Sequence, residues 1–345
     1  MAEYGRELQF ALFSHIERSS GSAALSQLYD EHLEFLTRAE QAGFYAFHLA
    51  EHHSTPLSMT PSPSLFLAAA SQRTRRLRLG AMVYLLPFYN PLRLINEICM
   101  LDHLCAGRLE VGVGRGISPF EHALFGTPVL ESRELFAEAF EVVLKGLTHP
   151  VLHHRGEYFR FTQVPLELRP MQTPHPPLWY GGMAERNARF AAEQGMNLAM
   201  IGPTALARQA IAVYREALEQ PNHAKVGSGP RKAAIMRLIY VAPTDREAEE
   251  IAAAAHKTHV ANIQKLWVHF GVDDRRTNHD YPTARQAGTI IAGSPTQVAS
   301  ELGSQLEQCR ANYLMCNMKF GSLDASQSLA SLELFATRVM PALRV

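Results

Sequence analysis

The sequence predicts a single (β/α)8 TIM barrel of the α/β class, and three observations lead to this prediction. The length of 345 residues suits one such barrel, which takes about 200 to more than 400 residues. Hydrophobic residues make up 47% of the chain and charged residues 19%, enough for a large core. Strand-like and helix-like segments alternate eight times. We therefore expect residues 1–345 to form one domain.

In the first half of the chain, short apolar runs predict strands, and apolar residues at helical spacing predict the helices between them. Asn90-Pro91, like Ser62-Pro63, is a typical helix start, and Gly43 lies where a C-terminal cap belongs. The strands are expected at 8–14, 44–50, 77–86 and 108–113, and the helices at 25–43, from 63, and at 91–104.

The second half continues the alternation. Strands are expected at 178–181, 196–201, 233–241 and 312–319, and helices at 132–147, 185–194, from 203, after 244, from 294 and at 324–340. Two segments interrupt the pattern. The aromatic and proline-rich excursion at 150–176 predicts a small hairpin, and the polar, aperiodic residues 271–292 predict a long mobile loop. A doubly wound sheet is the alternative, but no GxGxxG turn follows the first strand.

Composition excludes several classes of protein. Lys+Arg and Asp+Glu are both 33, and a chain without basic excess is a poor ligand for nucleic acid or anionic membranes. No apolar run is long enough to span a membrane, and MAEYGRELQF does not resemble a signal peptide. The four cysteines form no CxxC pair, so we expect neither a disulfide framework nor a zinc site built from them. We therefore expect the protein in a reducing, cytoplasmic compartment.

In a barrel, the active site lies at the carboxyl ends of the strands. The second strand ends in Glu51-His52-His53, where a histidine can move protons and the glutamate can orient it. These residues can also be a polar strand cap without chemistry. Without HExxH or a third ligand at regular spacing, we expect no metal there.

Three further strand ends indicate a ring-shaped, phosphorylated ligand, although each has a purely structural explanation. Residues 82–86 make an apolar wall that suits a flat ring, or packs the core. Arg115, between two glycines, can fork onto a phosphate, or simply lie in a tight turn. Residues 181–187 start a helix whose free backbone N–H groups would face the same phosphate, unless the glycines serve packing alone.

Taken in order, these strand ends resemble those of the bacterial luciferase-like, flavin-dependent monooxygenases. The similar text covers nearly the whole chain and is most specific from EHH to GVGRG. It comprises GFYAFHLAEHH (43–53), LRLGAMVYLLPFYNPLR (77–93), MLDHLCAGRLEVGVGRG (100–116), PPLWYGGMAERNARFAAEQG (176–195), AGSPTQVASEL (292–302) and FATRVMPAL (335–343).

The resemblance implies flavin mononucleotide (FMN) at the barrel mouth, with His52 as the catalytic histidine and Glu51 as its neighbour. It also implies a non-proline cis peptide between Met82 and Val83 under the flavin ring, and Arg115 on the phosphate. The other implied cofactor-binding residues are Asn90, Gly114, Gly182, Met183, Ala184 and Asn187. Three positions depart from the luciferases: Gly114 replaces a reactive cysteine, Met183 a glutamate, and Ala184 a serine, which leaves only the backbone N–H as a donor.

The implied function is that of a two-component monooxygenase. Reduced FMN, supplied by a separate flavin reductase, and O2 would oxidise a small organic substrate through a C4a-hydroperoxyflavin. Two alternatives keep the fold: a deazaflavin-dependent hydride-transfer enzyme, and a non-catalytic flavin-binding protein. A barrel hydrolase fits poorly, because no paired strand-end carboxylates appear. The resemblance also implies a homodimer.

The substrate is expected to be apolar, because the loops at the barrel mouth carry few charges. These loops are residues 14–22, 54–61, 118–126 and 271–292, the last expected to act as a lid.

Overall fold

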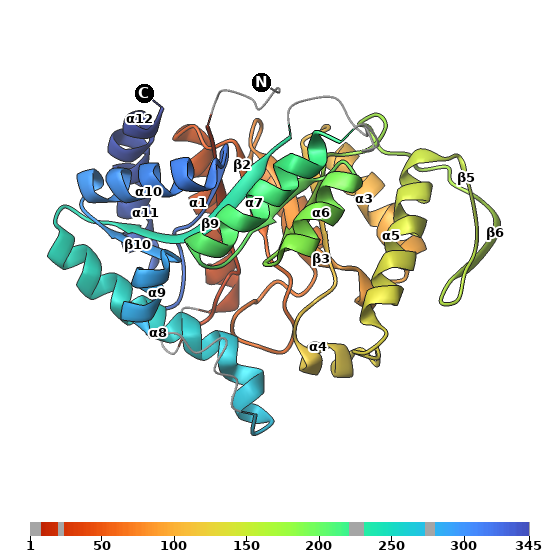
Figure 1. Cartoon of the computed structure of the whole chain (residues 1–345), viewed down its shortest axis with the longest axis horizontal. Coiled ribbons are helices and arrows are strands. Elements are labelled where there is room, and N and C mark those ends of the chain that lie inside the picture. The colour runs from red at the N-terminus through yellow and green to blue at the C-terminus, as the bar shows by residue number, and fades with distance from the viewer. Residues whose placement is uncertain (1–7, 20–23, 221–230, 273–279, 345) are drawn as a thin grey trace.

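The computed structural model describes residues 8–19, 24–220, 231–272 and 280–344, and its centre is a closed barrel of parallel strands (Figure 1). The barrel closes because β9 pairs with both β8 and β11, and β11 pairs with β1. The predicted barrel is confirmed, with all eight strands where the apolar runs placed them. They are β1 (Gln9–Ser14), β2 (Ala46–Leu49), β3 (Arg78–Leu85), β4 (Leu109–Gly114), β7 (Leu178–Gly182), β8 (Asn197–Met200), β9 (Ala233–Val241) and β11 (Tyr313–Asn317).

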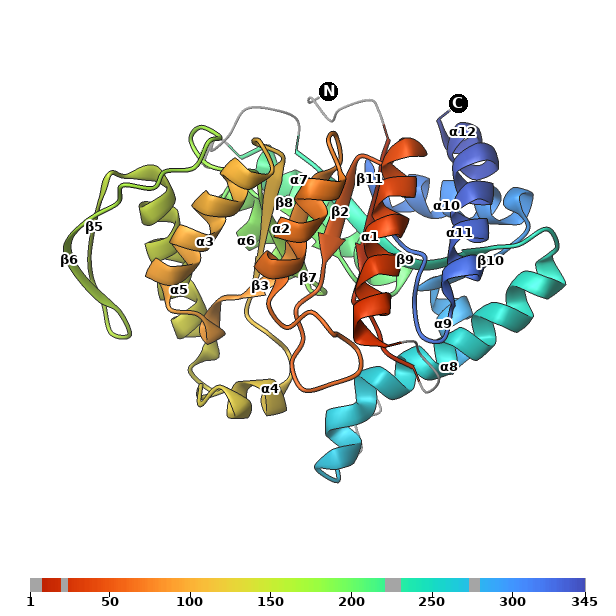
Figure 2. The same cartoon turned by 180° about the vertical axis from the view of Figure 1, so that it is seen from behind.

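Helices surround the barrel, and the view from behind shows α1, α2 and α3 covering the early strands (Figure 2). Helix α3 begins at the predicted cap, where the Asn90 side chain accepts from its first turn, and α11 begins with a capping box of Asp324 and Gln327. The helices are α1 (Leu25–Gln41), α2 (Pro63–Arg73), α3 (Pro91–Leu104), α5 (Ser132–Thr148), α6 (Glu185–Glu193), α7 (Thr204–Leu218), α8 (Asp245–His269), α10 (Pro295–Cys309), α11 (Ala325–Leu334) and α12 (Met340–Leu343), the last two joined by a π turn at Phe335–Val339. None of the helices in the described ranges is long and apolar enough to cross a membrane.

The predicted excursion is an antiparallel hairpin of β5 (Val151–Arg155) and β6 (Arg160–Pro165), which lies to the side of α5 (Figure 1). Its turn is held by Glu138 of α5, whose carboxylate accepts backbone N–H groups from Glu157, Tyr158 and Phe159. The hairpin is therefore attached to the barrel through a helix.

The prediction of an aperiodic loop over 271–292 is wrong for its second part. That part contains α9 (Tyr281–Ala287) and β10 (Ile290–Gly293), which pairs with the carboxyl end of β9. Asp280 caps α9 by accepting from Thr283, and Gly288 ends it with a φ of 72°. These are ordinary boundary signals, hidden by the polar text around them. Residues 273–279 of the expected lid lie outside the described residues, as do residues 20–22 of the first mouth loop.

A short helix that the sequence did not predict, α4 (Pro119–Leu124), lies in the mouth loop after β4. Ser118 caps it by accepting from the backbone N–H of Glu121. In Figures 1 and 2, α4 lies at the lower end of the molecule, opposite the chain termini. It therefore marks the carboxyl ends of the strands, where the candidate site was expected.

Candidate active site

His52 lies just after β2 at the barrel mouth, with its side chain one-quarter exposed. Its Nδ1 is 3.3 Å from Oε1 of Glu121, and the same oxygen accepts the backbone N–H of His53 at 2.7 Å. Burial opposes ionisation of Glu121, but the hydrogen bonds and charges of the two histidines outweigh it and lower the pKa of this carboxyl. An ionised carboxylate can only accept, so it holds the proton on Nδ1 and leaves Nε2 of neutral His52 as an acceptor.

Glu51 does not contact His52, so the prediction that it orients this histidine is wrong. Its Oε1 lies 2.8 Å from Nε2 of His53, and its Oε2 accepts from Leu85 N at 3.2 Å and the Tyr89 hydroxyl at 2.8 Å. In extended chain, residues two apart point to the same side and neighbours to opposite sides, which agrees with Glu51 meeting His53. Burial raises the pKa of Glu51. Glu121, six residues after Arg115, takes the expected orienting position.

The peptide bond between Met82 and Val83 is a non-proline cis bond, as the resemblance implied. The Val83 side chain extends towards two glycines on neighbouring strands. A Cβ on Gly114 would lie 2.4 Å from Val83 Cγ2, and one on Gly181 would lie 3.1 Å from Cγ1. A side chain at position 114 would therefore collide with Val83.

Arg115 extends from the end of β4 towards α5, where its Nη1 donates to Ser132 Oγ at 2.8 Å. Its charge also acts on the Tyr180 hydroxyl: burial raises the pKa of Tyr180, and the nearby Asn187, Arg115, Arg186 and Arg133 oppose that rise. The charges of Arg115, Arg133 and Arg186 therefore all act at the end of one strand. Sequence reasoning found only Arg115, because the other two lie on different helices.

The start of α6 lies beside Tyr180, where the charges of Arg115, Arg133 and Arg186 together form the basic corner. Asn187 Nδ2 donates to the Tyr180 hydroxyl at 3.3 Å, and a Cβ on Gly182 would come within 2.6 Å of Asn187 Cβ. Ala184 is the N-cap residue and makes no side-chain cap bond, so the first turn keeps backbone N–H groups that an anion can use. Gly182, Ala184 and Asn187 thus lie together at the start of α6, and the charge of Arg115 acts on the neighbouring Tyr180.

Two predicted cofactor residues have other surroundings. The Asn90 Oδ1 is engaged by Leu92 N and Arg93 N at the start of α3. Met183 is 50% exposed, and its sulfur lies near Gly202 after β8. The structure gives Asn90 a capping role and leaves Met183 beside the mouth.

Sequence reasoning missed a second polar group at the mouth, formed by His15 and Glu17 after β1 and by His259 and Asn262 of α8. His259 Nδ1 lies 2.7 Å from Glu17 Oε1, and Asn262 donates to Glu17 Oε2 at 3.0 Å. The His15 ring centroid is 5.6 Å from that of His52 and 5.7 Å from that of His259. Burial, with the charges of His52 and His259, holds the pKa of His15 well below its ordinary value. The location of His15 at a strand end was the available signal.

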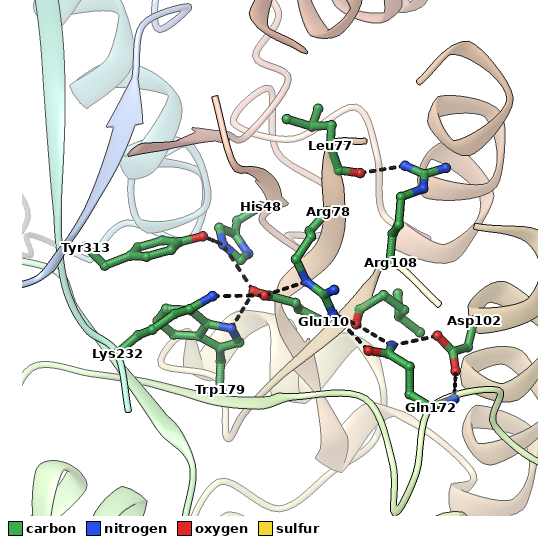
Figure 3. Close-up of polar contacts among 11 residues, drawn as sticks. His48, Leu77, Arg78, Asp102, Arg108, Glu110, Gln172, Trp179, Lys232 and Tyr313 are labelled. Atoms are coloured by element: carbon green, nitrogen blue, oxygen red, sulfur yellow. Dashed lines mark hydrogen bonds and ion pairs between the residues drawn. The ribbon is translucent and has the colours of Figure 1, made fainter. Parts of the chain in front are cut away.

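Inside the barrel, a second group of charged side chains surrounds Glu110 of β4 (Figure 3). Its carboxylate lies 2.8 Å from Arg78 Nε and 3.3 Å from Lys232 Nζ, and accepts the Trp179 indole N–H at 2.7 Å. Burial alone would raise the pKa of Glu110, but Lys232, His48 and Arg78 lower it to about 2. Burial lowers the pKa of His48 to about 4, so near pH 7 this histidine is neutral. The cations that pair with Glu110 are then Arg78 and Lys232. The side chains of this group occupy the barrel interior away from the mouth.

The comparison with known protein families agrees with this geometry. The model of the luciferase-like monooxygenase family matches residues 8–312. The chain belongs to the luciferase-like monooxygenase family. The resemblance expected from the strand-end motifs is thereby confirmed.

Two curated relatives illustrate the range of this luciferase-like family. The uncharacterized protein y4wF of Sinorhizobium fredii is 36% identical over 324 residues, 94% of each chain. The oxygenase component of the flavin-dependent trigonelline monooxygenase of Acinetobacter baylyi is 31% identical over 193 residues, 55% of this chain and 53% of the relative.

Solved structures share the fold over almost the whole chain. Monooxygenase RslO1 from Streptomyces bottropensis has a TM-score of 0.86 at 24% identity, covering 97% of this chain and 99% of its own. The oxygenating constituent of 3,6-diketocamphane monooxygenase from Pseudomonas putida, in complex with FMN, has a TM-score of 0.81 at 21% identity, with 97% and 98% covered. An F420-dependent secondary alcohol dehydrogenase has a TM-score of 0.72 at 20% identity, with 98% and 100% covered. The fold therefore accommodates both flavin and deazaflavin enzymes.

Proposed function

We propose that this member of the family is a monooxygenase that uses reduced FMN and O2 to oxidise a small organic substrate at the barrel mouth, with the reduced flavin delivered by a separate reductase. The observation that carries the proposal is the segment after β4. It supplies Arg115 to the basic corner and, six residues later, Glu121 to His52. The residue expected to bind the phosphate and the residue that orients His52 thus come from one short stretch of chain. The relative named as an oxygenase component supports the separate reductase.

The residues at the mouth fit a phosphorylated flavin. Arg115, Arg133 and Arg186 supply positive charge near Tyr180, and the first turn of α6 supplies backbone donors. Gly114 and Gly181 leave room for Val83 against the expected ring position. The Arg115 guanidinium would hold the phosphate, and Val83 would support the ring.

The bound reduced flavin would supply two electrons, so that one oxygen atom of O2 enters the substrate and the other leaves as water. The protein would contribute orientation and proton transfer. Glu121 keeps the proton of His52 on Nδ1, so Nε2 can take a proton at the reacting centre and return it. Glu121 acts through His52 and is a positioning residue.

An anaerobic titration of the purified protein with reduced FMN tests the proposal, with reduced F420 titrated in parallel. We expect FMN to bind more tightly. Arg115→Ala should weaken FMN binding about tenfold or more, because a charge-assisted hydrogen bond contributes ~1.5–3 kcal/mol. Arg38→Ala, which removes an exposed arginine paired with Glu34 on α1, should leave the affinity unchanged. An affinity unaffected by Arg115→Ala would remove this residue from the site.

The same titration decides between FMN and a deazaflavin. The three arginines of the basic corner also suit the longer anionic tail of a deazaflavin, which keeps hydride transfer as the second candidate function. Tighter binding of F420, with no oxygenated product from candidate substrates when reduced FMN is supplied by a flavin reductase and NADH, would replace the monooxygenase proposal with this one. Binding of FMN without oxygenated product from any candidate substrate would favour a non-catalytic flavin-binding protein.

A further inference from the structure

Three side chains with metal-binding atoms meet at the mouth, from parts of the chain far apart in sequence. His15 and Glu17 follow β1, and His259 lies on α8. One ligand atom from each lies within 4.8 Å of the other two, and all three residues are buried. The expectation of no metal-binding site considered only ligands at regular spacing along the sequence, so this group escaped it.

We propose that His15, Glu17 and His259 bind one divalent transition-metal ion of the Zn²⁺ type. Two imidazoles and one carboxylate are a donor set that such ions prefer, with bonds of about 2.0–2.2 Å. In a tetrahedral site with such bonds the ligand atoms lie about 3.4 Å apart, so one ion can reach all three atoms after side-chain movements of about 1 Å. Burial excludes most of the water that would compete for the ion.

The contacts around Glu17 leave one oxygen for the ion. Asn262 Nδ2 donates to Oε2, which fixes the carboxylate, and Oε1 faces His259 Nδ1 at 2.7 Å. An ion between Glu17 and His259 would replace that single hydrogen bond. The amide of Asn262 would then be an outer-sphere partner, of the kind that orients metal-bound carboxylates.

Asn317, at the end of β11, provides an independent observation. It is fully buried, its Nδ2 lies 3.5 Å from His15 Nδ1, and its Oδ1 has no hydrogen-bond partner among the described residues. Buried amide oxygens without a partner are rare and call for an explanation. An oxygen beside a metal ligand can serve as a fourth ligand, or accept from a water molecule bound to the ion.

The position of the site indicates what the ion would do. Glu17 and His259 are 242 residues apart, so the ion would connect the end of β1 to the long helix α8. The ring centroid of His15 is 5.6 Å from that of His52, so the link would lie directly beside the candidate proton-transfer residue. The ion would hold α8 at the mouth whichever cofactor the enzyme uses, which makes this proposal independent of the FMN proposal.

The test uses the full-length protein, stripped with EDTA and dialysed. Zn²⁺ is titrated by calorimetry, and Co²⁺ by its visible absorbance, which reports coordination by nitrogen and oxygen. We expect one ion per chain, together with a rise in Tm because the ion binds only the folded state. His15→Ala and His259→Gln should each weaken Zn²⁺ binding at least about 100-fold, because each removes a direct ligand.

Two further variants keep the test decisive. His256→Gln changes a buried histidine one turn before His259 on α8, outside the proposed ligand set, and should retain the affinity. Glu17→Gln keeps the size of the side chain and should weaken binding even if a histidine variant fails to fold. Absence of stoichiometric binding overturns the proposal, and so does binding that survives both His15→Ala and Glu17→Gln. In that case Glu17 and His259 form only a hydrogen-bonded pair.

Discussion

Replacing Glu110 by glutamine should strongly destabilise the barrel. Glutamine has the same shape but no charge, so Arg78 and Lys232 would remain inside the barrel without a counter-charge, and the Trp179 N–H would face an amide group. Breaking a buried ion pair by removing one partner typically costs about 3–5 kcal/mol. Arg78 and Lys232 are 19% and 15% exposed, so water partly solvates them and the lower end of that range applies.

The electrostatics of Glu110 lead to a similar magnitude. The pKa of Glu110 is about 2, against an ordinary value of 4.5. Because the folded state lowers the pKa, the stabilisation is present above about pH 4.5 and disappears as the pH falls towards 2. The difference between the two pKa values corresponds to about 3 kcal/mol of folding free energy near pH 7.

Urea unfolding followed by circular dichroism measures this effect. At pH 7 Glu110→Gln should reduce the free energy of unfolding by about 3 kcal/mol. Glu34→Gln, which removes an exposed partner of Arg38, should change it by less than about 0.5 kcal/mol. Between pH 4.5 and 2 the wild-type protein should lose stability faster than Glu110→Gln, so the two should converge. A loss below about 1 kcal/mol at pH 7, or a difference independent of pH, would refute the electrostatic account.

The other predictions concern the mouth. Gly114→Ala places a methyl group 2.4 Å from Val83 Cγ2, so it should lower the free energy of unfolding by about 1–3 kcal/mol and weaken binding of reduced FMN. Gly303→Ala makes only an ordinary contact at 3.5 Å and should change neither quantity. Equal urea midpoints for the two variants would contradict this reasoning. Glu121→Gln should shift the proton of neutral His52 partly from Nδ1 to Nε2, since an amide can also donate; imidazole 15N chemical shifts at pH 8.5 measure this, and an unchanged tautomer would mean that Glu121 does not hold the proton.

Much of the barrel could be predicted because its signals are local. Strands such as β9 (Ala233–Val241) are buried along their whole length and read as continuous apolar runs, and caps such as Asn90 act within one turn. The elements that escaped prediction are α4 (Pro119–Leu124), α9 (Tyr281–Ala287) and β10 (Ile290–Gly293), which are too short for an apolar period to stand out.

The site was predicted only as far as position along the strands determines it. A residue that ends a strand must lie at the mouth, which is why His52 and Arg115 could be placed from sequence. Which side chain contacts which could not be predicted. Glu51 was expected to orient His52 because the two are adjacent, yet adjacency in extended chain directs side chains apart, and Glu121 makes that contact from another loop.

By itself, the sequence determined the order of strands and helices, the family, and the end of the barrel that carries the chemistry, because each follows from local periodicity or from motifs contiguous in the chain. Only the tertiary structure decided the pairing of Glu121 with His52, the combined action of three arginine charges on Tyr180, and the meeting of His15 and Glu17 with His259. The physical reason is distance along the chain. Closure of the barrel brings β1 and α8 together, and no local pattern records a contact between residues 242 positions apart.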